Sequence, residues 1–231
     1  LPNGAKATGQ AWVFNLRRGM KWSDGEPFNA DDLLFWYEDI ALNKDLSPSF
    51  PSWLTVADEP VVFEKVDDYT VRFVFQEAYG LLIRLIPFHG EIFSPGHYLQ
   101  QFHPAYTSMA DLQSQAEAAD YDEWYQYFGS KNGYLENTER PQVYPWVLRT
   151  LPPETTTRAE RDPYYWKVDP EGNQLPYIDN VNTRLTEDRE VINLMASAGE
   201  LDMQFRHLEL ANYTLFADSE AEGDYRLVRW T

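Results

Sequence analysis

Cysteine is absent from the 231 residues, and this absence excludes several kinds of site at once. Without thiols the chain has no disulfide bond, no zinc site built on cysteine and no cysteine nucleophile. The absence does not assign a cellular compartment, because many exported proteins also lack cysteine.

Basic residues are scarce, and long apolar runs are missing. The chain has 19 Lys and Arg against 37 Asp and Glu, which gives a net charge of -18 at pH 7. This charge repels a phosphate backbone, and no basic cluster interrupts the acidic background, so nucleic acid is excluded as a partner. No apolar run approaches the roughly 20 residues that span a bilayer, so we expect membrane contact only through a tether or a membrane-bound partner.

Motifs of catalysis and metal binding are also missing. The sequence contains no G-x-S-x-G, no phosphate loop and no G-x-G-x-x-G. Four histidines lack the spacing of a helical metal pair: His89, His97, His103 and His207. We therefore predict no catalytic residue, no metal and no cofactor, and hence no enzyme. A hydrolase acting on an extracellular polymer stays open only as a remote alternative that rests on unpaired carboxylates.

Aromatic residues are abundant, with 8 Trp, 15 Tyr and 13 Phe. Together with a hydrophobic share of 43%, they supply enough buriable surface for a core and exclude a disordered chain. The length allows one large domain or two small ones.

The first half of the chain alternates strand and helix patterns. Apolar residues at every second position predict a strand over 12–16 and a hairpin over 61–75. Asn29 is a good N-cap for the helix that follows. A short helix over 81–86 and helical sequence over 108–128 come next. The predicted inner positions of these elements are Leu33, Trp36, Tyr37, Ile40, Val71, Phe73, Phe75, Leu112, Ala116, Trp124, Tyr125 and Phe128.

The second half follows a predicted loop over 129–141, where we expect the chain to change domain. Strands are predicted over 143–148, 155–161, 181–186, 201–205 and 225–230, with a helix over 208–216. Another helix begins near Thr186 and ends at Gly199, a position suited to positive φ. Its predicted inner face consists of Val191, Leu194, Met195 and Ala198. This mixed order predicts an α/β or α+β fold.

Two aromatic residues stand out on a predicted loop. Phe50 and Trp53 lie in a segment broken by Pro48 and Pro51, which cannot form a helix or a central strand. Aromatic rings on loops often stack on sugars or peptide side chains. Two interpretations stay open with equal weight: the two rings contact a ligand, or they seal the edge of the core.

One long stretch carries a family resemblance. Residues 14–32 read FNLRRGMKWSDGEPFNADD. They resemble the signature F-x-L-R-x-G-x-K-W-S-D-G-x-P-F-T-A-x-D of the family 5 extracellular solute-binding proteins, the peptide and oligopeptide receptors of ABC importers. Asn29 replaces the usual Thr, and both residues cap helices. We interpret the signature as structural, because it fixes a strand, a turn and a helix start together.

Further stretches resemble the same family in the same order. Residues 68–73 are similar to its D-x-x-T-V-x-F hairpin, and residues 198–203 to x-G-E-I-D-M. Residues 161–166 are similar to R-N-P-x-Y-W, with Asp162 in place of Asn. Residues 166–179 resemble a branch whose members are labelled peptide receptors but include oligosaccharide binders.

The resemblance implies a type II periplasmic-binding-protein fold, whose two lobes close on a ligand by a hinge. It implies that residues 1–135 form an accessory domain and residues 136–231 part of the first ligand-binding lobe. Family members usually have well over twice this length, so we expect a piece of a longer protein that lacks the second lobe. Such a piece carries at most half of the ligand site. In peptide receptors of the family an aromatic residue on the loop after the signature helix approaches the ligand, so the resemblance implies this role for Phe50 and Trp53.

The resemblance also implies a function. We predict a non-catalytic, substrate-binding component of an ABC importer that captures oligopeptides, with an oligosaccharide receptor as the alternative. The expected partners are the ligand and the membrane permease subunits. The first residues show no signal peptide. The expected location of the longer protein is the periplasm or the cell exterior, with a membrane association for which a lipid anchor is one form.

Overall fold

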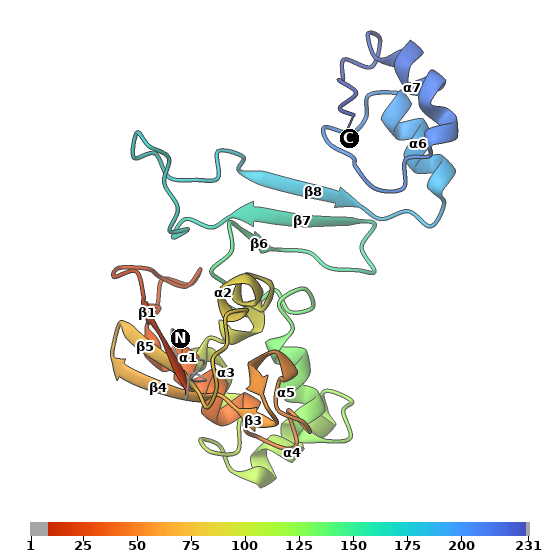
Figure 1. Cartoon of the computed structure of the whole chain (residues 1–231). Coiled ribbons are helices and arrows are strands. Elements are labelled where there is room, and N and C mark those ends of the chain that lie inside the picture. The colour runs from red at the N-terminus through yellow and green to blue at the C-terminus, as the bar shows by residue number, and fades with distance from the viewer. Residues whose placement is uncertain (1–8, 230–231) are drawn as a thin grey trace, which may run out of the picture. The chain divides into compact units, whose positions relative to one another are not determined.

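The computed structural model describes residues 9–229, which form two compact units (Figure 1). Within these residues the first unit comprises 9–151 and 158–181, and the second comprises 152–157 and 182–229. Both strands and helices are present, which confirms the predicted mixed α/β class. The predicted domain boundary after residue 135 falls inside the first unit, and the domain division of a longer receptor stays a prediction.

The first unit is built on a three-stranded antiparallel sheet. Strands β1 (Gln10–Asn15), β4 (Val62–Asp67) and β5 (Thr70–Phe75) pair in the order β1-β5-β4, which confirms the predicted strand and hairpin. Val71, Phe73 and Phe75 are at most 1% exposed, as alternation predicts for the core face of a strand.

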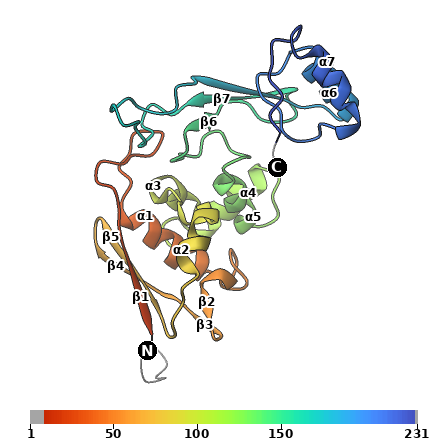
Figure 2. The same cartoon turned by 45° about the horizontal axis from the view of Figure 1, so that its top comes forward.

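Helix α1 (Ala30–Phe35) begins at the predicted cap and continues as a π-helical turn over Trp36–Ala41. The side chain of Asn29 accepts from the backbone N of Asp31, and the Asp32 side chain accepts from the backbone N of Asn29. Both views show α1 on one side of the sheet (Figures 1 and 2). Leu33 and Trp36 are 3% exposed, so the predicted inner face of this helix is confirmed.

The rest of the first unit is mainly helical. It contains β2 (Thr55–Val56), β3 (Glu59–Pro60), α2 (Leu82–Leu85), α3 (Gly96–Leu99), α4 (Met109–Ala118) and α5 (Trp124–Asn132). Single 3-10 turns cover Ser52–Leu54, Ile86–Phe88, Gly90–Ile92 and Gln100–Phe102. Two predictions were wrong in detail. Tyr125 lies on the outer side of α5 and is 36% exposed, because Trp124 and Phe128 already fill the inner side. Helix α5 also extends to Asn132, into the predicted loop.

A second sheet has the order β6-β7-β8, with β6 (Trp146–Leu148), β7 (Thr156–Arg161) and β8 (Asn180–Arg184). These strands match the predictions for 143–148, 155–161 and 181–186. Strands β6 and β7 pair antiparallel, with Trp146 opposite Arg161. The family stretch 161–166 therefore starts at the last residue of β7.

The second unit contains α6 (Arg189–Ser197), a 3-10 turn (Leu210–Asn212) and α7 (Tyr213–Ser219). Gly199 has φ +71 just after α6, as predicted for a helix C-terminus. The predicted inner face of α6 was wrong except for Met195. The buried side chains within this unit are Asn193, Met195 and Phe216, whereas Val191 and Leu194 are 40% and 62% exposed.

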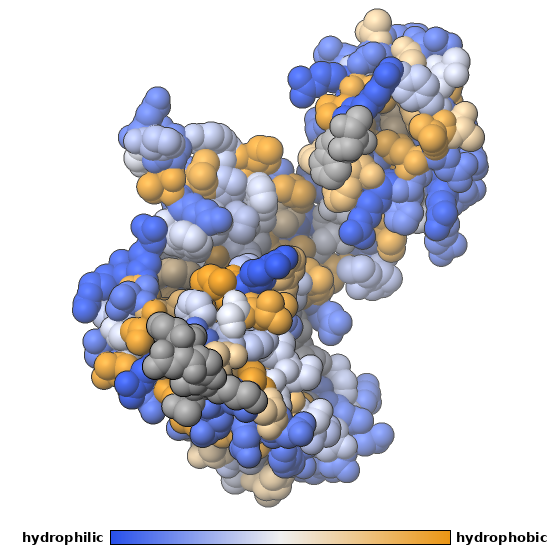
Figure 3. All heavy atoms as spheres, in the orientation of Figure 1, coloured by the Kyte–Doolittle hydropathy of each residue, from blue (hydrophilic) through white to orange (hydrophobic). Residues whose placement is uncertain are grey.

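Two predicted strands of the second unit do not form. Residues 201–205 and 225–229 have no strand structure, and Trp230 lies outside the described residues. Met203 and Phe205 are 78% and 68% exposed, and apolar side chains are visible among polar ones on this unit (Figure 3). A strand needs a neighbour for its backbone groups, and no described strand pairs with these segments. Within residues 9–229, no helix combines the length and apolar character that crossing a membrane requires.

Candidate functional site

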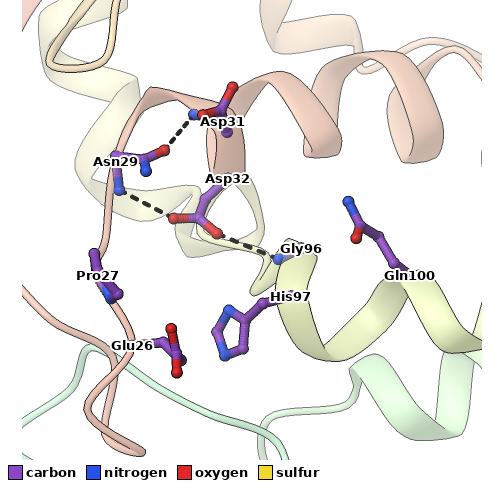
Figure 4. A pocket seen from close by; sticks show the side chains of 8 residues that line it. All are labelled: Glu26, Pro27, Asn29, Asp31, Asp32, Gly96, His97 and Gln100. Atoms are coloured by element: carbon purple, nitrogen blue, oxygen red, sulfur yellow. Dashed lines mark hydrogen bonds between the residues drawn. The ribbon is translucent and has the colours of Figure 1, made fainter.

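The family signature ends in a buried carboxylate. Asp32 is 6% exposed, and its side chain accepts three hydrogen bonds, two from within the signature and one from a segment 64 residues further along the chain. Oδ2 accepts from Trp22 Nε1 and from the Asn29 backbone N, both at 3.1 Å, and Oδ1 accepts from the Gly96 backbone N at 3.3 Å. Figure 4 shows the Asn29–Asp32 bond closing the cap of α1 and the Asp32–Gly96 bond joining the start of α1 to the start of α3. Burial raises the pKa of Asp32, and the three bonds act against this rise by favouring the ionised form.

The turn before α1 contacts two segments that are distant from it in sequence. Ser23 donates its backbone N to the Gln142 carbonyl at 2.8 Å, and its Oγ accepts from the Gln142 backbone N at 3.0 Å. Gly25 has φ +95, and a Cβ built there lies 3.2 Å from the hydroxyl oxygen of Tyr164. The Lys21 ammonium lies 5.0 Å from the centroid of the Tyr164 ring. We call this contact of residues 21–25 with Gln142 and Tyr164 the signature joint.

Trp166, another aromatic residue of the stretch 161–166, also contacts the signature. The Arg17 guanidinium lies 5.3 Å from the ring centroid of Trp166, within the range of cation–π attraction. Two family stretches that are more than 100 residues apart in sequence, 14–32 and 161–166, therefore contact each other inside the first unit. The sequence gives these stretches as separate matches to one family, and no local signal in either predicts their contact.

A shallow depression of about 270 Å³ opens beside the signature (Figure 4). It is lined by Glu26, Pro27, Asn29, Asp31, Asp32, Gly96, His97 and Gln100. Two of its three carboxylates are engaged elsewhere: Asp32 with the three N–H donors above, and Asp31 with Lys65 Nζ at 2.7 Å. Among the described residues, no three His, Asp or Glu side chains are placed to hold a metal ion. Asp31 and Asp32, which line the depression, thus serve the packing of the signature.

The two aromatic residues predicted to contact ligand lie apart from this depression's lining. Both are partly buried and pack against the main core of the first unit. The ring of Trp53 stacks on His89 with centroids 4.0 Å apart and planes 7° apart, and Phe50 meets Tyr37 edge to face at 6.1 Å. Tyr79 donates its hydroxyl to the Trp53 carbonyl at 2.8 Å. The structure thus brings both residues to the core edge, and their contact with a ligand stays a prediction.

His89 also bonds a carboxylate. Its Nδ1 lies 2.7 Å from Oε1 of Glu91, which fixes the imidazole that covers one face of Trp53. The Trp53 indole Nε1 is shielded and has no acceptor among the described residues. The proline-broken loop marks Trp53 in the sequence, but nothing local marks His89, because its role depends on a contact 36 residues away along the chain.

Comparison with known proteins identifies the family. Residues 5–225 match the family of bacterial extracellular solute-binding proteins, family 5 middle. The chain is 34% identical over 211 residues to the periplasmic alpha-galactoside-binding protein of Rhizobium meliloti (strain 1021), covering 87% of this chain and 28% of that protein. It is 27% identical over 195 residues to a probable ABC transporter-binding protein of Deinococcus radiodurans, covering 84% of this chain and 30% of that protein.

Solved structures give the same fold. An oligopeptide-binding protein OppA superposes with a TM-score of 0.90 and 43% identity, covering 96% of this chain and 36% of that chain. The binding protein MelB of Agrobacterium fabrum C58, in complex with stachyose, has a TM-score of 0.70 and 29% identity, covering 93% of this chain and 30% of that chain. The chain thus spans about a third of the length of these relatives and has part of the periplasmic-binding-protein fold.

Proposed function

The chain belongs to family 5 of the bacterial extracellular solute-binding proteins, and from this premise we propose that it is part of the substrate-binding component of an ABC importer. The component is non-catalytic, acts in the periplasm or outside the cell, and delivers its ligand to membrane permease subunits. A lipid anchor is one form its attachment to the membrane would take. In the complete receptor, residues 1–135 act as the accessory domain and residues 136–231 as part of the first lobe, while the second lobe comes from the rest of the polypeptide.

An oligosaccharide is our first candidate for the ligand. The observation that carries it is the 34% identity to a protein named for alpha-galactoside binding. The structure of MelB supports the same class, since it contains stachyose itself. Sugars are held by aromatic rings and hydrogen-bonding side chains, and this chain is rich in both.

An oligopeptide is the second candidate, and it was the first expectation from the sequence. The 43% identity to a protein named oligopeptide-binding protein supports it. The description of that structure mentions no bound peptide, whereas the MelB structure is a complex with stachyose. For this reason we place the oligosaccharide first.

Calorimetric titration of the complete receptor separates the two candidates. The receptor is titrated with stachyose and, separately, with a pool of tripeptides to pentapeptides. Saturable heat with stachyose and none with the peptides supports the first candidate. Saturable heat with the peptides and none with stachyose supports the oligopeptide instead. The absence of binding heat in both titrations contradicts both ligand classes.

We also propose that Trp53 and Phe50 contact the ligand in the complete receptor. Trp53→Leu retains apolar packing but removes the flat ring, so we expect it to weaken ligand binding at least about tenfold, the loss of about 1.4 kcal/mol. Tyr125→Leu is the matched control, because Tyr125 is an exposed aromatic residue on α5. Equal affinity of wild type and Trp53→Leu, with unchanged unfolding midpoints, would assign Trp53 to the core edge alone.

A further inference from the structure

Asp162 is a completely buried carboxyl group with one unpartnered oxygen. The residue is 0% exposed and follows the last residue of β7. Its backbone N donates to the Pro145 carbonyl at 2.9 Å, and its Oδ1 accepts from the Tyr164 backbone N at 2.8 Å. Its Oδ2 is shielded from solvent and has no hydrogen-bond partner among residues 9–229. Asp162 thus contrasts with Asp32, both of whose oxygens accept bonds.

Two charged groups act on Asp162 in opposite directions, and each is itself paired with another side chain. Arg149 favours the carboxylate, but it bonds Oε2 of Glu160 at 3.0 Å. Asp24 disfavours the carboxylate, and its Oδ2 lies 2.8 Å from Nε2 of His97. The largest effect on Asp162 is burial, which raises its pKa above the ordinary value of 3.8 and outweighs the hydrogen bond from the Tyr164 backbone N, which favours the carboxylate. A buried carboxylate with one donor is costly, whereas the neutral acid avoids most of that cost.

The position of Asp162 links this group to the signature joint. Its Oδ1 fixes the backbone of Tyr164, whose ring lies against Gly25 and below the ammonium of Lys21. We propose that the neutral side chain of Asp162 holds residues 162–166 against the signature turn, and that its ionisation at higher pH loosens this joint. Asp162 is therefore a positioning residue that makes the joint sensitive to pH.

The sign of the effect follows from linkage. Because folding raises the pKa of Asp162, the folded chain keeps a proton that the opened chain has lost. Stability of the joint is therefore full at low pH, falls as pH rises above 3.8, and levels off above the folded pKa. Asp162→Asn carries no ionisable group, so the same fall is absent from the variant.

Hydrogen exchange of the Tyr164 amide in the full 231-residue chain tests the proposal. In wild type, we expect its protection factor to fall about tenfold or more between about pH 4 and about pH 8. In Asp162→Asn, we expect a protection factor that changes less and exceeds the wild-type value at the upper end. Asp179→Asn is the matched control, since Asp179 is an exposed carboxylate that pairs with Arg161. It should follow the wild-type profile.

Three results would overturn the proposal. One is a Tyr164 protection factor in wild type that stays level or rises over this pH range, a measurement that needs no variant to fold. Another is an Asp162→Asn chain whose protection falls with pH as steeply as that of wild type. A uniform loss of protection in Asp162→Asn at every pH would also overturn it, because that pattern indicates a structural carboxylate like Asp32.

Discussion

Single buried polar residues determine how the signature packs, and Asp32 is the clearest example. Replacing Asp32 with Asn leaves one acceptor oxygen and places an NH2 group against an N–H donor. We expect Asp32→Asn to lower the free energy of unfolding by about 1–3 kcal/mol. Urea unfolding followed by circular dichroism measures the change.

Asp31→Asn is the control for this prediction. Asp31 is the next residue in the same helical turn, but it is exposed and pairs with Lys65 on the surface. Its replacement should cost less than about 1 kcal/mol. Equal losses for the two variants would contradict the central role given to Asp32.

His103 gives a second prediction at the residue scale, for acidic pH. It is 4% exposed, its Nε2 donates to the Asp39 carbonyl at 2.9 Å, and its Nδ1 accepts from the Ala105 backbone N at 3.3 Å. Both nitrogens are used by the neutral ring. Burial lowers the pKa of His103 below the ordinary value of 6.5, and Asp39 opposes this shift only in part.

The folded chain therefore binds fewer protons at this position than the unfolded chain. Its contribution to stability is full above pH 6.5 and is lost as the pH falls below that value. We expect the unfolding midpoint of wild type to drop more than that of His103→Gln between about pH 7 and about pH 5. Parallel midpoints of the two chains over this range would show that His103 does not titrate in this way.

At the scale of elements, the signature turn depends on a glycine. Gly25 combines φ +95 with a close approach to the Tyr164 ring. A Cβ disfavours this positive φ and crowds the Tyr164 ring. We therefore expect Gly25→Ala to lower the free energy of unfolding by about 1–2 kcal/mol. Gly129→Ala is the control: Gly129 lies within α5 with open space around it, and Ala there should stabilise by about 0.5–1 kcal/mol. Thermal unfolding tests whether the unfolding midpoint falls in Gly25→Ala and rises in Gly129→Ala.

The elements that sequence could predict are those whose signals are local. The cap at Asn29, the hairpin over β4 and β5 and the positive φ of Gly199 each follow from a few neighbouring residues. Residues 201–205 carry the same alternating pattern but form no strand, because pairing depends on a partner strand that the pattern does not contain. Likewise, no local signal leads from Asp32 to Gly96, or from Gly25 to Tyr164.

At the scale of the whole molecule, composition predicted the acidic surface and family resemblance predicted the partial fold. The charge of -18 is carried by residues that are mostly exposed, so it describes the surface rather than the core. The second unit exposes more large apolar side chains than it buries, among them Leu194, Met203 and Phe205. This imbalance fits a chain that spans about a third of its relatives' length.

The affinity for a ligand depends on the whole receptor, because two lobes together enclose the ligand. A ligand held by part of one lobe keeps much of its surface in water, whereas a closed site buries most of it. We therefore expect the 231-residue chain to bind stachyose with a Kd of about 1 mM or weaker, a free energy of about -4 kcal/mol at most. Calorimetry of this chain beside the complete receptor, in the same buffer, measures the difference. Micromolar binding by the chain alone would contradict the proposed division of the ligand site between two lobes.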